Sequence, residues 1–159
     1  MKLKAGLIAL AAVGVVSFAG TQVADAATWH KGIPKSVKGY WKAHTGGKKI
    51  KSGYYYNNYV YTSFSGTTIS TMLKEVTHQN GKNFPQFDSG SPFFYHVKYH
   101  YLGNHVYKFK GTYALGGGTG VMTVKVSKHK LLMNDNHKKT LLKKISHATY
   151  KKELYPLFK

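Results

Sequence analysis

The feature that most restricts the fold of this chain is an alternation of aromatic and basic residues over 93–113, which read FFYHVKYHYLGNHVYKFKGTY. Successive side chains of a β-strand point to opposite faces of the sheet, so this alternation predicts strands that are apolar on one face and basic on the other. Gly103 and Asn104 interrupt the pattern and are typical turn residues. The segment therefore predicts a β-hairpin.

The register of this hairpin decides which residues face the core. A two-residue loop at 103–104 places Tyr99 opposite Lys108, which mixes aromatic and basic side chains on each face. A three-residue loop at 103–105 instead places Tyr99 opposite Phe109. Because a slip of one residue exchanges the two faces, the segregation of aromatic from basic residues favours the three-residue loop.

In that register each face of the hairpin has one character. The aromatic face is expected to point inward and consists of Tyr95, Val97, Tyr99, Tyr101, Tyr107, Phe109 and Tyr113. The basic face is expected to point outward and consists of His96, Lys98, His100, Lys108 and Lys110. Like charges directly opposite each other destabilise a sheet, and an anionic partner relieves that cost. The five basic residues are therefore candidates for binding a polyanion.

Other segments of the chain predict further short strands and turns. Alternation or β-branched and aromatic residues predict strands from Gly39, at 54–64 (one bulged strand or a hairpin), and at 67–78, 121–127, 130–133 and 138–145. Turn residues predict a long loop at 79–92 and turns at 115–120 and 134–136. The C-terminal ATYKKELYPLFK predicts a short helix or arm that docks through Leu154, Leu157 and Phe158. About eight short strands indicate an all-β fold, either an eight-stranded antiparallel barrel or a sandwich.

The N-terminus has the three-part layout of a secretory signal peptide. Lys2 and Lys4 precede an apolar stretch that reaches about residue 20, and residues 24–26 (ADA) fit the small-x-small cleavage pattern. The apolar stretch is short for a membrane-spanning helix, which needs about 20 residues. We therefore expect cleavage after Ala26 and one secreted domain over 27–159, with no transmembrane segment. A secreted chain without cysteine relies on its core rather than on disulfides, and favours a Gram-positive source.

The charge of the chain is strongly one-sided. The chain has 24 lysines, no arginine and five acids, and removal of the signal peptide leaves 22 lysines and four acids, a net charge of about +18 with histidine neutral. A field of this sign attracts polyanions. Outside a bacterial cell these are anionic wall polymers and membrane phosphates more than nucleic acid. Lysine acts as a point charge and the chain has no arginine, which favours diffuse attraction over bidentate recognition. The alternative is that the excess lysine only maintains solubility.

The residues for catalysis or metal binding are not found in a recognisable pattern. The chain has no cysteine nucleophile and no Gly-x-Ser-x-Gly elbow. A glycosidase needs two acids in one site, whereas the mature acids are scattered at Glu75, Asp88, Asp135 and Glu153. His96 and His100 lie about 13 Å apart on a strand, too far for one metal ion. We therefore expect a protein that is not an enzyme, with no catalytic residue, no metal and no cofactor.

Two resemblances begin near the predicted mature N-terminus. The run Trp29-His30-Lys31-Gly32, with Pro34-Lys35 and Gly39-x-Trp41-Lys42 after it, resembles the start of small secreted proteins of lactic-acid bacteria, which implies a secreted location. Gly39-x-Trp41 is also similar to the opening motif of lipocalins. That resemblance implies a lipocalin-like (calycin) barrel around an apolar ligand, with Trp41 as a structural residue at its closed end.

Together these observations predict a basic protein that is extracellular or loosely associated with the cell wall. It is expected to bind anionic wall polymers, or other polyanions, through the five basic residues of the hairpin. The binding should weaken with salt and strengthen as histidines gain a proton. The alternative is a binder of a small apolar ligand in a tyrosine-rich barrel interior lined by Tyr95, Tyr99, Tyr101, Tyr107 and Phe109.

Overall fold

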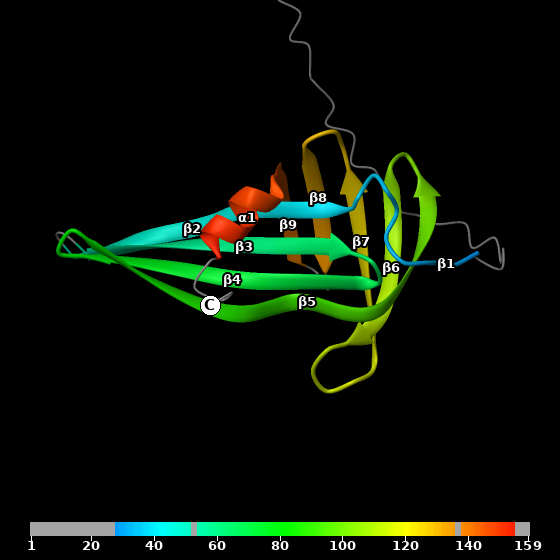
Figure 1. The fold of residues 1–159 in the computed structure, drawn as a ribbon, viewed down its shortest axis with the longest axis horizontal. Coiled ribbons are helices and arrows are strands. Elements are labelled where there is room, and N and C mark those ends of the chain that lie inside the picture. Colours follow the sequence, from blue (N-terminus) through cyan, green and yellow to red (C-terminus); the bar gives the residue numbers. More distant parts are fainter. Residues whose placement is uncertain (1–27, 52–53, 136–137, 155–159) are drawn as a thin grey trace, which may run out of the picture.

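The computed structural model describes residues 28–51, 54–135 and 138–154. The chain forms a closed eight-stranded antiparallel β-barrel, with one additional strand outside it and a short C-terminal helix (Figure 1). The predicted all-β fold is thus confirmed, and of the two expected architectures the barrel is the one formed. The predicted signal peptide lies outside the described residues.

The strands follow one another around the barrel in sequence order. The elements are β1 (His30–Lys31), β2 (Gly39–Lys51), β3 (Tyr54–Ser65), β4 (Thr68–Gln79), β5 (Lys82–Gly103), β6 (Val106–Tyr113), β7 (Thr119–Val126), β8 (Lys130–Asp135), β9 (Lys138–Ile145) and α1 (His147–Glu153). Each strand from β2 to β9 pairs with the next, and β9 pairs back with β2, which closes the barrel. Strand β1 pairs with β5.

The barrel interior is filled by apolar side chains that alternate along the strands. Trp41, Phe64, Phe94 and Phe109 are buried in this core, together with aliphatic residues of β7, β8 and β9. The indole Nε1 of Trp41 donates a hydrogen bond to the Val37 carbonyl at 3.0 Å. A buried indole needs such a partner, and the Val37 carbonyl supplies it.

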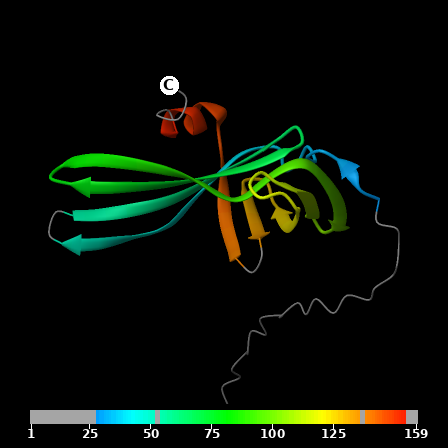
Figure 2. The same ribbon diagram turned by 90° about the horizontal axis from the view of Figure 1, so that it is seen from below.

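Strands β2 to β5 are longer than the others and extend beyond the barrel as a four-stranded sheet (Figures 1 and 2). The prediction of a long loop at 79–92 is wrong, because β5 already begins at Lys82. Asn80 and Gly81 have φ values of 51° and 74°, which is the geometry of a tight hairpin turn. Pro85 is tolerated because this part of β5 pairs with β4 only, so the proline faces an unpaired edge.

The predicted pairing of β5 with β6 is confirmed in its centre and wrong at its turn. Lys98 lies opposite Lys110, and Tyr99 lies opposite Phe109, as expected. The turn, however, is the residue pair Asn104 and His105, with φ values of 50° and 60°, rather than 103–105. The register shifts between Tyr101 and Gly103, so an extra residue in β5 preserves the segregation of the faces.

A second bulge in β5 turns Tyr95 outward, whereas the sequence predicted that Tyr95 points inward. The register with β6 shifts between Tyr95 and Lys98, and His96 has a φ of 52°. Phe94 is therefore inward before the bulge and Val97 is inward after it, and both are fully buried. Tyr95 points outward and is 43% exposed, which contradicts the strict alternation assumed over 95–101.

The remaining predicted elements agree with the structure in outline. Residues 54–64 form the single strand β3, 67–78 correspond to β4, and 121–127 correspond to β7. The hairpin of β8 and β9 is present, although Asn134 and Asp135 belong to β8 rather than to a turn. Leu154 is fully buried, as expected, whereas Leu157 and Phe158 lie outside the described residues.

Helix α1 covers the outer face of β2 to β4. Tyr150 and Leu154 pack against Tyr61 in a second apolar cluster that is separate from the barrel core. The Lys42 ammonium forms a salt bridge with the Glu153 carboxylate and donates a hydrogen bond to it at 2.8 Å. Lys74 Nζ donates a hydrogen bond to the Glu153 backbone carbonyl at 2.6 Å. No helix in the described part of the chain is both long and apolar enough to cross a membrane.

Candidate anion-binding face

The five basic residues predicted from the hairpin lie on the outside of β5 and β6. Lys98 is directly opposite Lys110, and His100 is directly opposite Lys108. His96, Lys98 and Lys108 are exposed, whereas His100 and Lys110 are half-buried. The intervening residues Val97 and Phe109 are fully buried, which fixes the basic side chains on the outer face.

Trp29 explains the lower exposure of His100 and Lys110. Its ring lies beneath the Lys110 ammonium, with Nζ 4.1 Å from the ring centroid, and 6.1 Å from the His100 ring. His100 Nδ1 is 3.3 Å from the Thr28 carbonyl oxygen. The cation–π contact holds Lys110 in place while leaving its charge intact. Sequence reasoning missed Trp29, because only the pairing of β1 with β5 brings it to this face.

The basic face continues beyond the hairpin onto β7, β8 and β9. We use the name outer lysine face for the outward-pointing basic residues of these strands and of the hairpin: His96, Lys98, His100, Lys108, Lys110, Lys125, Lys130, Lys139 and Lys143. The last four are exposed and alternate with buried residues such as Val124, Leu131 and Leu142. Lys130 lies directly opposite Lys143, a second pair of facing like charges. These four were not among the predicted site residues, since only the closure of the barrel joins them to the hairpin.

Carboxylates are absent from the outer lysine face within the described residues. Glu153 pairs with Lys42 under helix α1, in the one salt bridge among the described residues. The other three acids line cavities at the end of the barrel from which the extended sheet leaves: Glu75, Asp88 and Asp135. The lysines of the outer face are therefore not neutralised by any acid in the described part of the chain.

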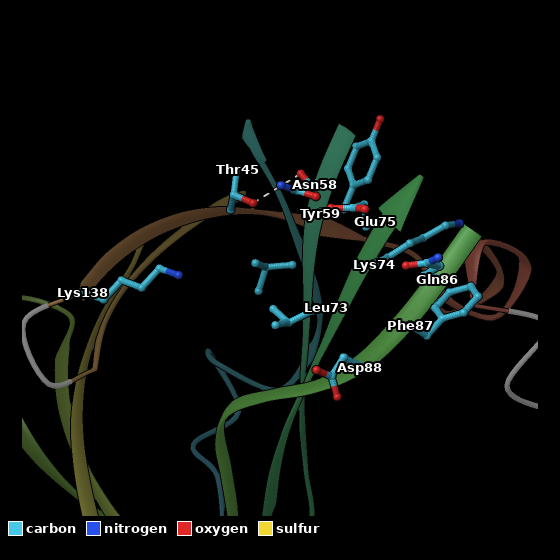
Figure 3. A pocket seen from close by; sticks show the side chains of 11 residues that line it. Thr45, Asn58, Tyr59, Leu73, Lys74, Glu75, Gln86, Phe87, Asp88 and Lys138 are labelled. Atoms are coloured by element: carbon cyan, nitrogen blue, oxygen red, sulfur yellow. Dashed lines mark hydrogen bonds between the residues drawn. The ribbon is translucent and has the colours of Figure 1, made fainter. Parts of the chain in front are cut away.

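A cavity of about 540 Å³ opens at the end of the barrel where β2 to β5 extend outward (Figure 3). Val60 and Leu73 form an apolar floor, and Glu75 and Asp88 follow on the same faces of β4 and β5. Lys138 reaches toward this floor from β9. A smaller adjoining cavity of about 130 Å³ is lined by polar and apolar residues including Ser91, Met133 and Asp135.

The tyrosine-rich surface proposed to line a ligand cavity lies elsewhere. Phe109 is fully buried, and Tyr99 and Tyr107 pack against the core. Tyr95 and Tyr101 are 43% and 48% exposed. None of these five residues belongs to the lining of the 540 Å³ cavity. The residues from β3, β4 and β5 that do line it were not predicted, because most of β5's first half was expected to be a loop.

Comparison with protein families, with characterised proteins and with solved structures found no match. The resemblances to secreted proteins of lactic-acid bacteria and to lipocalins therefore stay predictions. What the geometry offers chemically is a dense array of ammonium groups on the barrel, with no carboxylate of residues 28–51, 54–135 and 138–154 among them. Such an array attracts anions over a distance and holds them by charge rather than by shape.

Proposed function

We propose that this protein is a secreted, non-enzymatic binder of extracellular anionic polymers, and that it contacts them through the outer lysine face. The observation that carries the proposal is the pairing of Lys98 with Lys110 and of Lys130 with Lys143 at directly opposed positions. Facing like charges cost stability in a sheet, and a bound polyanion removes that cost. Anionic polymers of a Gram-positive cell wall are partners of this kind.

The first test replaces three lysines of the hairpin. The variant with Lys98, Lys108 and Lys110 each changed to Glu should bind long-chain inorganic polyphosphate at least about tenfold more weakly than the wild type at low salt. A matched control changes three exposed lysines of the extended sheet, Lys48, Lys49 and Lys82, to Glu. Equal weakening in both variants would mean that net charge, rather than this face, determines the affinity.

The cavity favours a second candidate function, the binding of a small molecule. In the lining of the larger cavity two lysines, Lys74 and Lys138, offset the two carboxylates, so the preference for a ligand with an apolar body and a protonated amine rests on Asp135 in the adjoining cavity. Asp135 Oδ2 accepts a hydrogen bond from Ser91 Oγ at 2.8 Å, and its buried Oδ1 has no partner among the described residues. A buried carboxylate oxygen without a donor is costly, and an ammonium group would satisfy it.

Calorimetry with matched alkyl ligands tests this second function. An alkylamine should bind more tightly than the alkanol or the alkyl carboxylate of equal chain length, and the preference should shrink in the Asp135→Asn variant. No preference for the amine, with an intact fold, would remove the second function while leaving the first untouched.

A further inference from the structure

Six of the seven lysines of the outer face form an ordered path rather than a diffuse patch. From Lys98 the path crosses to the directly opposite Lys110 and moves two residues along β6 to Lys108. Lys108 faces Thr123 on β7, and Lys125 lies two residues further in the same direction. Together these steps carry the path sideways around the barrel and along its strands.

The second half of the path repeats this geometry. Lys125 faces Leu132 on β8, and Lys130 again lies two residues further in the same direction. Lys130 faces Lys143 on β9, where the path ends, because the next lysine across, Lys42 on β2, is neutralised by Glu153. We call Lys98, Lys110, Lys108, Lys125, Lys130 and Lys143 the lysine stripe.

The spacing of the stripe follows from sheet geometry. Directly opposite residues are about 5 Å apart, residues two apart along a strand are about 6.6 Å apart, and diagonal neighbours are about 7–8 Å apart. The stripe is therefore about 30 Å long when measured along the Cα atoms, with one lysine Cα every 5–8 Å or so. No acid of the described chain lies on it.

The curvature of the stripe indicates the shape of its partner. Strand β9 is four strands away from β5 in a closed barrel of eight, so Lys98 and Lys143 lie about halfway around the barrel from each other. A flat surface such as a lipid bilayer touches only one side of such a barrel. A small polyvalent anion reaches only two or three of the lysines. A flexible linear chain can follow the whole stripe.

We infer that the lysine stripe is the track of a single flexible, linear polyanion that wraps about half of the barrel. This inference rests on the proposed function and specifies its partner: a polymer with a regular anionic group along its backbone and at least about 30 Å of bound length. Trp29 lies at the start of the track, where its contact with Lys110 holds that ammonium group on the path.

The test compares the two halves of the stripe and two chain lengths of one probe. One variant changes Lys98, Lys108 and Lys110 to Glu, a second changes Lys125, Lys130 and Lys143 to Glu, and the control changes Lys48, Lys49 and Lys82 to Glu. Circular dichroism establishes that each variant is folded. Affinity is measured for tripolyphosphate, for long-chain polyphosphate at equal phosphate concentration and for anionic vesicles, over a series of salt concentrations.

The inference predicts comparable effects of the two halves. Each stripe variant should lose at least about tenfold in affinity for long-chain polyphosphate and lower the slope of log affinity against log salt by roughly three, about one for each lysine removed. The control should retain both values, and tripolyphosphate should bind the wild type far more weakly than the long chain.

The outcomes separate the two proposals. If only the hairpin variant binds more weakly, the face binds anions but the stripe is wrong. If neither variant differs from the control, the proposed function itself is wrong. A third outcome is that the wild type binds anionic vesicles as tightly as long-chain polyphosphate, with only one of the two stripe variants weakening vesicle binding. In that case the partner is a flat anionic surface, and the inference of a wrapped chain is overturned.

Discussion

At the residue scale, Glu153 shows how one carboxylate is held in a chain dominated by lysine. Burial alone would raise the pKa of the Glu153 carboxyl, but hydrogen bonds from Lys42 and Tyr61 and the charges of Lys42 and Lys74 hold that pKa below its ordinary value of 4.5. The pKa of Tyr61 is raised, first by burial and then by its hydrogen bond to Glu153. The ionised carboxylate therefore connects helix α1 to the barrel.

The substitution Glu153→Gln should lower the free energy of unfolding at neutral pH by about 1–2 kcal/mol, because it leaves Lys42 and Lys74 facing each other without a counter-charge. Since the pKa is lower in the folded state, the carboxylate stabilises the fold above pH 4.5 and loses this effect as the pH falls through the folded pKa. Chemical denaturation at neutral and at acid pH measures the difference, with Lys152→Gln as an exposed control. An equal difference at both pH values would contradict the role given to the charge.

Gly120 is a second residue whose substitution should change the stability of the fold. It lies opposite Gly111 on β6, and a Cβ atom at this position would overlap the ring of Phe94, which is fully buried. The Gly120→Ala variant should therefore lose about 1–3 kcal/mol of stability through overpacking. Thermal unfolding of this variant beside the exposed Thr119→Ala variant tests the expectation. Equal melting temperatures would show that Phe94 can move aside.

At the scale of elements, the β5–β6 hairpin shows which part of a pattern is informative. The segregation of aromatic from basic residues correctly predicted Lys98 opposite Lys110. The same pattern could not reveal the bulges near His96 and Leu102, since each adds a residue without disturbing the segregation further along. The two-residue turn was hidden because its second residue, His105, has a φ of 60°, where any residue other than glycine is uncommon.

The turn yields a prediction of its own. His105 adopts a left-handed backbone conformation that costs a non-glycine residue about 1–2 kcal/mol, and Asn-Gly is the preferred sequence of such a turn. His105→Gly should therefore raise the free energy of unfolding, by up to about 1 kcal/mol once the extra freedom of glycine in the unfolded chain is counted. Urea denaturation measures it. A loss of stability would mean that the His105 side chain makes a contact that outweighs the strain.

The loop predicted at 79–92 failed for a different physical reason. Gly, Pro, Asn and Asp in that segment are turn formers on average, but Asn80 and Gly81 alone make the turn. The remaining residues continue as a strand because β4 offers a long paired edge and Pro85 faces the unpaired side. Only the length of β4 in the folded sheet shows this.

At the scale of the whole molecule, closure of the barrel creates the features that the sequence could not indicate. It joins the predicted lysines of the hairpin to Lys125, Lys130 and Lys143, which are distant in the chain. It also gathers Glu75, Asp88 and Asp135 around the cavities at the opposite end. The sign of the charge was predictable from composition, whereas its separation into a basic exterior and a cavity mouth of mixed charge depends on strand order.

We propose that the protein binds anionic polymers by charge through its barrel exterior. The most direct measurement is the retention of the 27–159 chain on purified Gram-positive cell walls, with and without their anionic polymers, over a series of salt concentrations. We predict retention that disappears when the polymers are removed and that falls steeply with salt. Retention that is unchanged by either treatment would contradict the account.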